Sequence, residues 1–198
     1  MKPYYQDQSV TIYHGDCRQI VPQLGSFDLL LTDPPYGLGK KLQGGSWGKK
    51  YKGNDLDWDA AAPDLEFIMP HGNKSIIWGG NYFSLTPSRR WLVWNKPNAV
   101  PSAADCELAW CSWDGNAQVF TKTVNPDGKR QHPTQKPLAL MQWCINLAGD
   151  VQTILDPYAG SGTTGRAAKD LGKQAVLIEM DEQYCEIAAQ RMAQEVLL

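Results

Sequence analysis

The chain has 198 residues, with 21 acidic and 19 basic side chains and a formal net charge of −2. This balance argues against a protein that holds DNA through a uniformly basic surface, so any nucleic-acid contact has to come from a local basic patch. Five cysteines without a Cys-x-x-Cys pair argue against a disulfide framework and a zinc site, and no apolar run approaches the roughly 20 residues of a membrane span. We therefore expect one metal-free, cytoplasmic domain over residues 1–198, without a membrane partner.

Short apolar runs that end at turn residues predict the strands. The run Phe27–Thr32 is almost continuously apolar and stops at Asp33, which is typical of a strand buried on both faces of a parallel sheet. The remaining predicted strands are Val10–His14, Ser75–Trp78, Trp91–Trp94, Glu107–Trp113, Gln152–Leu155 and Gln174–Ile178.

Helical patterns lie between several of these strands. Pro137–Leu147 opens with a proline suited to a first turn, and Thr163–Leu171 is followed by a glycine that favours a helix end. Asp181–Leu198 reads as a final amphipathic helix, and Ala60–Met69 is a weaker helical pattern. The stretches Gly37–Asp59 and Val119–Lys136 are expected to be irregular. Strands that alternate with helices predict an α/β sheet covered on both faces.

A glycine loop follows the predicted strand Gln152–Leu155. The segment Asp156–Thr164 reads Asp-Pro-Tyr-Ala-Gly-Ser-Gly-Thr-Thr and leads from a strand into a helix. Glycines let the backbone approach a ligand, and the free N–H groups of a helix start favour a negative group. Glu179, at the end of the next strand, could accept hydrogen bonds from ribose hydroxyls. Together these features predict a site for a nucleoside-bearing cofactor, since the loop lacks the phosphate-binding GxxxxGK[ST] pattern.

A second turn of unusual composition follows the strand Phe27–Thr32. It reads Asp33-Pro34-Pro35-Tyr36, and the two prolines make it stiff. The aspartate can accept a hydrogen bond from an amino group, and the tyrosine offers a flat stacking face. An ordinary strand-ending turn would not need these four residues in this order, so we interpret the turn as catalytic.

With these two motifs, the chain resembles the bacterial and phage DNA amino-methyltransferases, which make N6-methyladenine or N4-methylcytosine. It is similar to their permuted subgroup, in which the Asp-Pro-Pro-Tyr turn precedes the cofactor loop. The matching blocks are Gly15-Asp16-Cys17, Asp33–Tyr36, His132–Pro137 and Asp156–Thr164 with Glu179. The resemblance implies a Rossmann-like S-adenosylmethionine-dependent methyltransferase fold with a mostly parallel seven-stranded sheet and a circularly permuted motif order.

The resemblance also implies roles for individual residues. S-adenosylmethionine would be the cofactor and S-adenosylhomocysteine the product, with no metal involved. The catalytic residues would be Asp33, Pro34, Pro35 and Tyr36. The residues around the cofactor would be Asp16, Cys17, Asp33, Thr134, Lys136, Asp156, Tyr158, Gly160, Gly162, Thr163 and Glu179. The target amino group would donate to Asp33 and the Pro34 carbonyl, and the base would be flipped out of the duplex onto Tyr36.

A mobile basic loop over about 37–59 directly follows the catalytic turn. Its basic residues are Lys40, Lys41, Lys49, Lys50 and Lys52. Such a loop could grip DNA phosphates and become ordered on binding. The alternative is a solvated loop whose lysines only aid solubility. Its position beside the catalytic turn favours the contact with DNA.

The chain departs from larger family members at Val119–Gln131, where little sequence is left for a target-recognition domain. We therefore expect relaxed or very short sequence specificity, recognition by the basic loop, or help from a second subunit of a homodimer. This favours a stand-alone, phage-type enzyme over the partner of a restriction enzyme.

The target atom is a separate question. Asp33 as the first residue of the catalytic turn favours adenine N6, with cytosine N4 as the alternative. The sequence also leaves open an RNA methyltransferase, a non-catalytic nucleic-acid or cofactor-binding module and, least favoured, a nicotinamide-dependent oxidoreductase.

Overall fold

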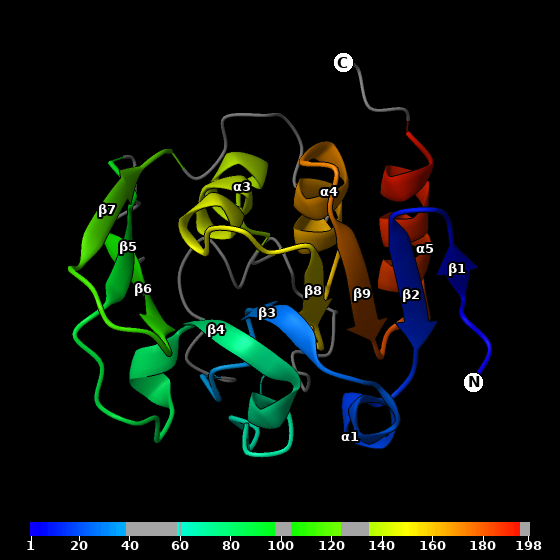
Figure 1. Cartoon of the computed structure of the whole chain (residues 1–198), viewed down its shortest axis with the longest axis horizontal. Helices are drawn as coiled ribbons and strands as arrows, with labels where there is room; N and C mark the ends of the chain where they lie inside the picture. Colours follow the sequence, from blue (N-terminus) through cyan, green and yellow to red (C-terminus); the bar gives the residue numbers. More distant parts are fainter. Residues whose placement is uncertain (39–58, 60, 98–103, 124–134, 195–198) are drawn as a thin grey trace.

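The computed structural model describes residues 1–38, 59, 61–97, 104–123 and 135–194. Within these ranges, nine strands form one sheet in the order β1-β2-β9-β8-β3-β4-β6-β5-β7 (Figure 1). Their bounds are β1 Tyr5–Gln6, β2 Val10–His14, β3 Phe27–Thr32, β4 Gly72–Trp78, β5 Trp91–Asn95, β6 Cys106–Cys111, β7 Gln118–Thr121, β8 Thr153–Asp156 and β9 Gln174–Glu179.

The centre of the sheet is parallel and its flanks are mixed. Strands β2, β9, β8, β3 and β4 run parallel to one another. In contrast, β1 pairs antiparallel with β2, and β6 pairs antiparallel with both β4 and β5. The predicted α/β fold is confirmed, but the expected count of seven strands is wrong because the described part of the chain has nine.

Strand β7 lies partly in the stretch expected to be irregular. Its four residues, Gln118–Thr121, pair in parallel with Leu92–Asn95 of β5. A run this short shows no clear strand period by itself, so the pairing with β5 determines its conformation. The prediction of irregular structure is therefore wrong for residues 119–121.

Four helices and three short 3₁₀ segments are described. They are α1 Cys17–Ile20, η1 Val21–Gln23, η4 Met69–His71, η5 Gly80–Tyr82, α3 Leu138–Leu147, α4 Thr163–Asp170 and α5 Glu182–Ala193. Figure 1 shows α3, α4 and α5 in a row along one face of the sheet, with α1 near the carboxyl end of β2. None of the helices in the described ranges is long and apolar enough to cross a lipid bilayer.

The buried strands divide their side chains between two cores. Leu29 and Leu31 of β3 belong to the cluster that includes residues of α3, α4 and α5. Leu30, between them, belongs to the second cluster, which includes residues of α1. All three leucines are fully buried. This alternation explains the continuous apolar run in the sequence, because each face of the strand is covered.

A hydrogen-bond cluster sets the alignment of β3 and β8, the two strands that carry the motifs. One carboxylate oxygen of Asp28 accepts bonds from the Gln152 N–H, the Thr153 N–H and the Thr153 hydroxyl, each at 2.9 Å. These bonds lower the pKa of Asp28. They align the amino ends of β3 and β8, so the carboxyl ends of the two strands also lie side by side.

The prediction of a helix over Ala60–Met69 is wrong. Residues 61–68 form a bend and a turn, and the 3₁₀ segment η4 begins only at Met69. Asp64 accepts a hydrogen bond from the Glu66 N–H at 2.9 Å, a local bond that competes with helix formation. Pro63 and Pro70 also lack the N–H donors that a helix needs.

Candidate active site

The two motifs meet at the carboxyl edge of neighbouring parallel strands. Asp156 is the last residue of β8, and Asp33 directly follows β3. From β8 the chain continues through α4 to β9, which lies beside β8 on the side away from β3. From β3 the chain continues to β4, which lies beside β3 on the side away from β8, so the strand order reverses between β3 and β8. The carboxyl edge at such a reversal is where open α/β sheets bind their ligands. The Thr32 hydroxyl donates to Asp156 at 2.7 Å, which joins segments 124 residues apart.

Asp156 is a buried carboxylate held by neutral donors. Besides Thr32, the Thr164 hydroxyl donates to it at 2.5 Å and the Tyr158 N–H at 3.1 Å. The side chain forms no ion pair among the described residues. Burial raises the pKa of Asp156 to about 6, and the hydrogen bonds only partly oppose this rise. A buried anion of this kind favours a cationic ligand.

The glycine loop after Asp156 has the backbone that its sequence predicts. Gly160 and Gly162 have φ of 50° and 77°, a region that L side chains rarely adopt. Helix α4 begins directly after Gly162, which forms no side-chain cap. A Cβ on Gly162 would come within 2.8 Å of the Ala188 Cβ, so α5 packs against the loop too closely for another residue.

Two side chains hold this loop from outside the motif. The Glu179 carboxylate accepts from the Gly160 N–H at 2.7 Å, and burial raises the pKa of Glu179. Arg191 of α5 donates to the Ser161 carbonyl at 2.7 Å and to the Thr163 hydroxyl at 3.1 Å. The loop is therefore braced by β9 on one side and by α5 on the other.

Two residues of the predicted cofactor pocket, Asp16 and Cys17, lie at the start of α1. Asp16 caps α1 by accepting from the Arg18 N–H, and it also pairs with the Arg18 guanidinium, which lowers the pKa of Asp16. Cys17 is buried, and Tyr158 of the glycine loop packs against the core cluster that contains it. This packing connects the α1 segment to the glycine loop.

The catalytic turn carries a charged cluster. The Tyr36 hydroxyl donates to one Asp33 oxygen at 2.5 Å, and the Lys136 ammonium donates to the other. Lys136 also lies 3.0 Å from Glu107, and Glu107 in turn lies 3.0 Å from the Lys96 ammonium. Asp33 thus stands at one end of a row of side chains with alternating charge, which continues through Lys136 and Glu107 to Lys96.

Burial and charge act in opposite directions within this row. Burial raises the pKa of Asp33, Lys136 opposes the rise, and Glu107 adds to it. Burial alone would lower the pKa of Lys136, but its two carboxylate neighbours hold that pKa above its ordinary value. For Glu107, burial is outweighed by the two lysines, and its pKa is lowered. Lys136 and Glu107 are therefore both charged at neutral pH.

The Tyr36 ring is packed in a defined way. Gly79 approaches it so closely that a Cβ at that position would overlap the ring. The ring of Tyr82 stacks on Tyr36 with 4.9 Å between centroids and 15° between planes, although Tyr82 is 46% exposed. The turn is closed on the other side by Asp59, whose carboxylate accepts from the Gly37 and Leu38 N–H groups.

The described residues thus bring together most of the predicted site. Asp33, Tyr36 and Lys136 lie in direct contact, and Asp156 and Glu179 lie at the ends of adjacent strands. Thr134 and the lysines of the basic loop are outside the described residues; those lysines are Lys40, Lys41, Lys49, Lys50 and Lys52.

Several contributors have no motif to identify them. They are Asp59, Tyr82, Lys96, Glu107 and Arg191. The only sequence signal is a charged residue at the edge of an apolar strand run, as at Lys96 and Glu107. No group of three or more His, Cys, Asp or Glu side chains in the described ranges is arranged to hold a metal ion.

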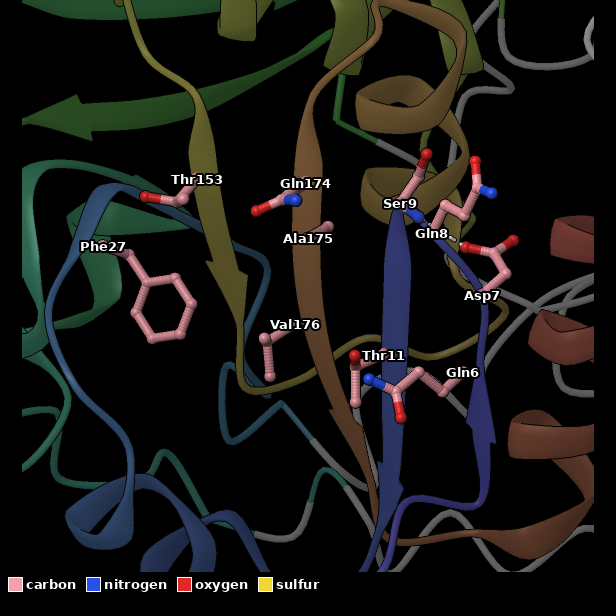
Figure 2. Close-up of a pocket in the computed structure, with 10 residues that line it drawn as sticks. All are labelled: Gln6, Asp7, Gln8, Ser9, Thr11, Phe27, Thr153, Gln174, Ala175 and Val176. Carbon is pink, nitrogen blue, oxygen red and sulfur yellow. Dashed lines mark hydrogen bonds between the residues drawn. The ribbon is translucent and has the colours of Figure 1, made fainter.

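A separate hollow lies at the opposite edge of the sheet (Figure 2). It is lined by Phe27, Thr153 and Gln174, the first residues of β3, β8 and β9, together with residues around β1 and the start of β2. Since both motifs follow the carboxyl ends of their strands, this hollow is not part of the candidate active site.

Comparison with known proteins gives consistent matches. A family model described as DNA methylase matches residues 101–190. The chain is 24% identical to the type II methyltransferase M.ScaI of Streptomyces caespitosus, over 98% of this chain and 84% of that protein. It is 26% identical to the crystal structure of the M1.HpyAVI–SAM complex, with a TM-score of 0.60, over 93% of this chain and 100% of that chain.

A more distant match concerns the fold alone. The PvuII DNA methyltransferase, described as cytosine-N4-specific, is 18% identical, with a TM-score of 0.65 over 100% of this chain and 91% of that chain. This likeness agrees with the α/β sheet described above.

Proposed function

We propose that this relative of the bacterial DNA amino-methyltransferases transfers a methyl group from S-adenosylmethionine to the exocyclic amino group of a DNA base. The family match and the relatives confirm the resemblance that the motifs indicate. One observation carries the proposal. The hydrogen bond between Thr32 and Asp156 fixes the predicted catalytic turn beside the predicted cofactor loop, as a transfer between two ligands requires.

The residues present fit such a cofactor. Asp156 is a buried carboxylate with only neutral partners among the described residues, which suits a cofactor that carries an ammonium and a sulfonium. The start of α4 offers backbone N–H groups that would suit the cofactor carboxylate. Glu179, at the end of β9, would accept from ribose hydroxyls with its remaining lone pairs, and Asp16 would lie near the adenine ring. When bound, the cofactor supplies an electrophilic methyl group.

The catalytic turn would prepare the nucleophile. An exocyclic amino group is a poor nucleophile because its lone pair is delocalised into the ring. Hydrogen bonds to Asp33 and to the Pro34 carbonyl would draw the nitrogen toward a tetrahedral shape. The nitrogen would also lose a proton as it receives the methyl group. Asp33, which would already accept a hydrogen bond from that nitrogen, is the proposed base, and its raised pKa suits it to accept the proton.

The Tyr36 ring is proposed to stack on the base once the base has left the duplex. The Asp33–Tyr36 hydrogen bond fixes the ring, so the stacking surface and the acceptor move as one unit. The basic loop over 37–59 is proposed to hold the DNA backbone. Because bacterial and phage DNA lies in the cytoplasm, the reaction would take place there.

Adenine N6 is our preferred target atom, because the turn begins with Asp33. Cytosine N4 is the second candidate, since cytosine carries the same kind of exocyclic amino group. Purified protein should be incubated with labelled S-adenosylmethionine and with matched unmethylated DNA and RNA. We expect N6-methyldeoxyadenosine in hydrolysed DNA. N4-methyldeoxycytidine would correct the target atom, whereas label in RNA alone, or in neither polymer, would refute the proposal.

A further inference from the structure

Behind the catalytic turn, four side chains of alternating charge form a continuous row. The order is Asp33, Lys136, Glu107 and Lys96, with 3.0 Å between Glu107 and each of the two ammonium groups. Glu107 lies on β6, and Lys96 follows β5. Because β6 pairs with both β4 and β5, the sheet itself brings these groups to the site from different parts of the sequence.

The row is buried enough for its pairing to matter. The Lys136 side chain is 5% exposed and that of Lys96 is 8% exposed. A buried ammonium without a partner is strongly unfavourable, so each of these lysines needs a carboxylate at all times. Glu107 is the group that both lysines contact, one through each of its carboxylate oxygens.

Asp33 faces a conflict between this row and the reaction proposed above. Its two oxygens are already engaged, one by the Tyr36 hydroxyl and the other by the Lys136 ammonium. A target amino group that donates to Asp33 has to share one of these oxygens, each of which has a second lone pair, with Tyr36 or Lys136. Since Tyr36 lies on the same rigid turn, Lys136 is the partner that can give way, by shifting toward Glu107. The ammonium then depends on Glu107 alone.

We infer that Glu107 is a positioning residue for the proposed methyl transfer. It holds the Lys136 ammonium in place while Asp33 accepts a hydrogen bond from the target amino group instead of from Lys136. The inference rests on the proposed function and extends it to a residue outside the motifs. Lys96 holds the other oxygen of Glu107, so the acceptor that receives Lys136 is itself fixed. Glu107 touches neither ligand in this mechanism and acts only through Lys136.

Glu107→Gln preserves the shape of the side chain and removes its charge. Lys136 would then have Asp33 as its only anionic partner and would release it less readily. At saturating DNA and cofactor, we expect kcat to fall by about ten- to a hundredfold, the effect of one charge-assisted hydrogen bond. Binding of S-adenosylmethionine should change by less than about twofold. Glu107→Asp keeps the charge and should recover part of the loss, and Glu66→Gln, on an exposed turn, is the matched control.

A titration of Asp33 tests the coupling without any turnover. The charged groups around this carboxyl are Lys136, Glu107, Lys96 and Asp156, besides the hydroxyl of Tyr36. Removal of the negative charge at Glu107 should move the Asp33 midpoint to lower pH. Removal of the positive charge in Lys96→Met should move it to higher pH. Carbon-13 NMR of the labelled carboxyl groups in the free protein measures both shifts, and the Lys96 variant serves if Glu107→Gln does not fold.

The outcomes separate the inference from the proposed function. If the wild-type protein methylates no DNA, the proposed function fails, and the titration still decides whether Glu107 is coupled to Asp33. Wild-type kcat in Glu107→Gln, or the same Asp33 midpoint in the wild type and both variants, would overturn the inference. A loss of cofactor binding equal to the loss of kcat would also overturn it, because it would indicate a purely structural role.

Discussion

Asp156 and Asp33 sit at the carboxyl ends of adjacent parallel strands, yet their surroundings are opposite in kind. Asp156 is held by two hydroxyls and a backbone N–H, all of them neutral and within or next to the two motifs. Asp33 is held by a hydroxyl and by a lysine that belongs to a row of buried charges. A carboxylate with neutral partners can keep them when a cationic ligand binds, whereas a neutral amino group that donates to Asp33 has to share its oxygens with a charged lysine.

We call the carboxyl end of β8 the Asp156 end of the site and the carboxyl end of β3 the Asp33 end. Their different surroundings suit them to separate tasks in the proposed reaction. The Asp156 end is preorganised, because its donors come from the rigid loop and the first turn of α4. The Asp33 end is arranged for exchange, because Lys136 has two carboxylates within reach. Substitutions at the two ends should therefore separate cofactor binding from methyl transfer.

The largest expected effect belongs to Asp33. Asp33→Ala removes the acceptor for the target amino group, and we expect kcat to fall by about a thousandfold or more, comparable to the loss of a principal electrostatic group in other active sites. Cofactor binding should survive, because Asp156 and Glu179 are unchanged. Methyl incorporation into DNA and calorimetric binding of S-adenosylmethionine measure the two quantities.

The matched control is Asp33→Asn, which keeps the volume of the side chain and leaves Lys136 with Glu107 as its anionic partner. It should bind cofactor like the wild type and remain strongly impaired in transfer. Normal turnover in either variant would be incompatible with the proposed role of Asp33.

Asp156 should show its effect in the pH dependence of stability. Its pKa in the folded state is raised from 3.8 to about 6, so ionisation is disfavoured in the fold. The resulting stability is fully present below the unfolded pKa and is lost as pH rises through about 6, a change of about 3 kcal/mol. Asp156→Asn should remove this contribution from the free energy of unfolding, measured with urea between about pH 4 and pH 7.

The same substitution tests the fit to a cationic cofactor. In the wild type, the affinity for S-adenosylmethionine should fall as pH drops below about 6, because protonation neutralises Asp156. In Asp156→Asn, the affinity should be weaker and nearly independent of pH over that range. Asp28→Asn is a control at the other end of β8, since that carboxylate has a lowered pKa. A parallel pH dependence of affinity in wild type and Asp156→Asn would contradict the assignment.

The sequence predicts the Asp156 end far better than the Asp33 end. The partners of Asp156 come from Thr32, Tyr158 and Thr164, which all lie in or beside the motifs. Strand ends, glycine positions and the following helix are local properties, and the residues that satisfy the carboxylate are local as well. The predicted strands Val10–His14 and Phe27–Thr32 agree with β2 and β3 for the same reason.

The partners of Asp33 depend on tertiary pairing. Glu107 reaches the site because β6 runs antiparallel between β4 and β5, and no spacing in the sequence reveals that arrangement. The resemblance assigns Lys136 to the cofactor pocket, and the structure places it against Asp33 and Glu107. Strand β7 could not be predicted because its pairing with β5 determines its conformation. The turn over 61–68 could not be predicted because a local side-chain hydrogen bond favours it over a helix.

A smaller effect on the Asp33 end should come from Tyr82. This ring stacks on Tyr36 and is itself partly exposed, so it offers a flipped base a second aromatic surface next to Tyr36. We expect Tyr82→Ala to raise the KM for DNA by about tenfold, the low end of what one base–aromatic stack contributes, with little change in cofactor affinity. Tyr82→Phe keeps the ring and should behave like the wild type. An unchanged KM in Tyr82→Ala would show that the ring takes no part in holding the base.

The smallest effect is expected on the Asp156 end, at Arg191, which supports the glycine loop from behind without lying in the motif. One of its guanidinium nitrogens donates to the Ser161 carbonyl, the Ser161 hydroxyl and the Thr163 hydroxyl. Arg191→Met removes these donors and keeps much of the apolar stem, so it should cost about 1–2 kcal/mol of unfolding free energy. Because a preorganised loop loses less entropy on binding, the affinity for S-adenosylmethionine should fall by only about three- to tenfold, with kcat at saturation unchanged. Urea unfolding and calorimetry measure the two effects, and Arg89→Met, whose ion pair with Asp114 is exposed, is the control. A fall in kcat without a fall in affinity would mean that the two ends of the site are coupled through the loop, which would contradict the separation of tasks between Asp156 and Asp33.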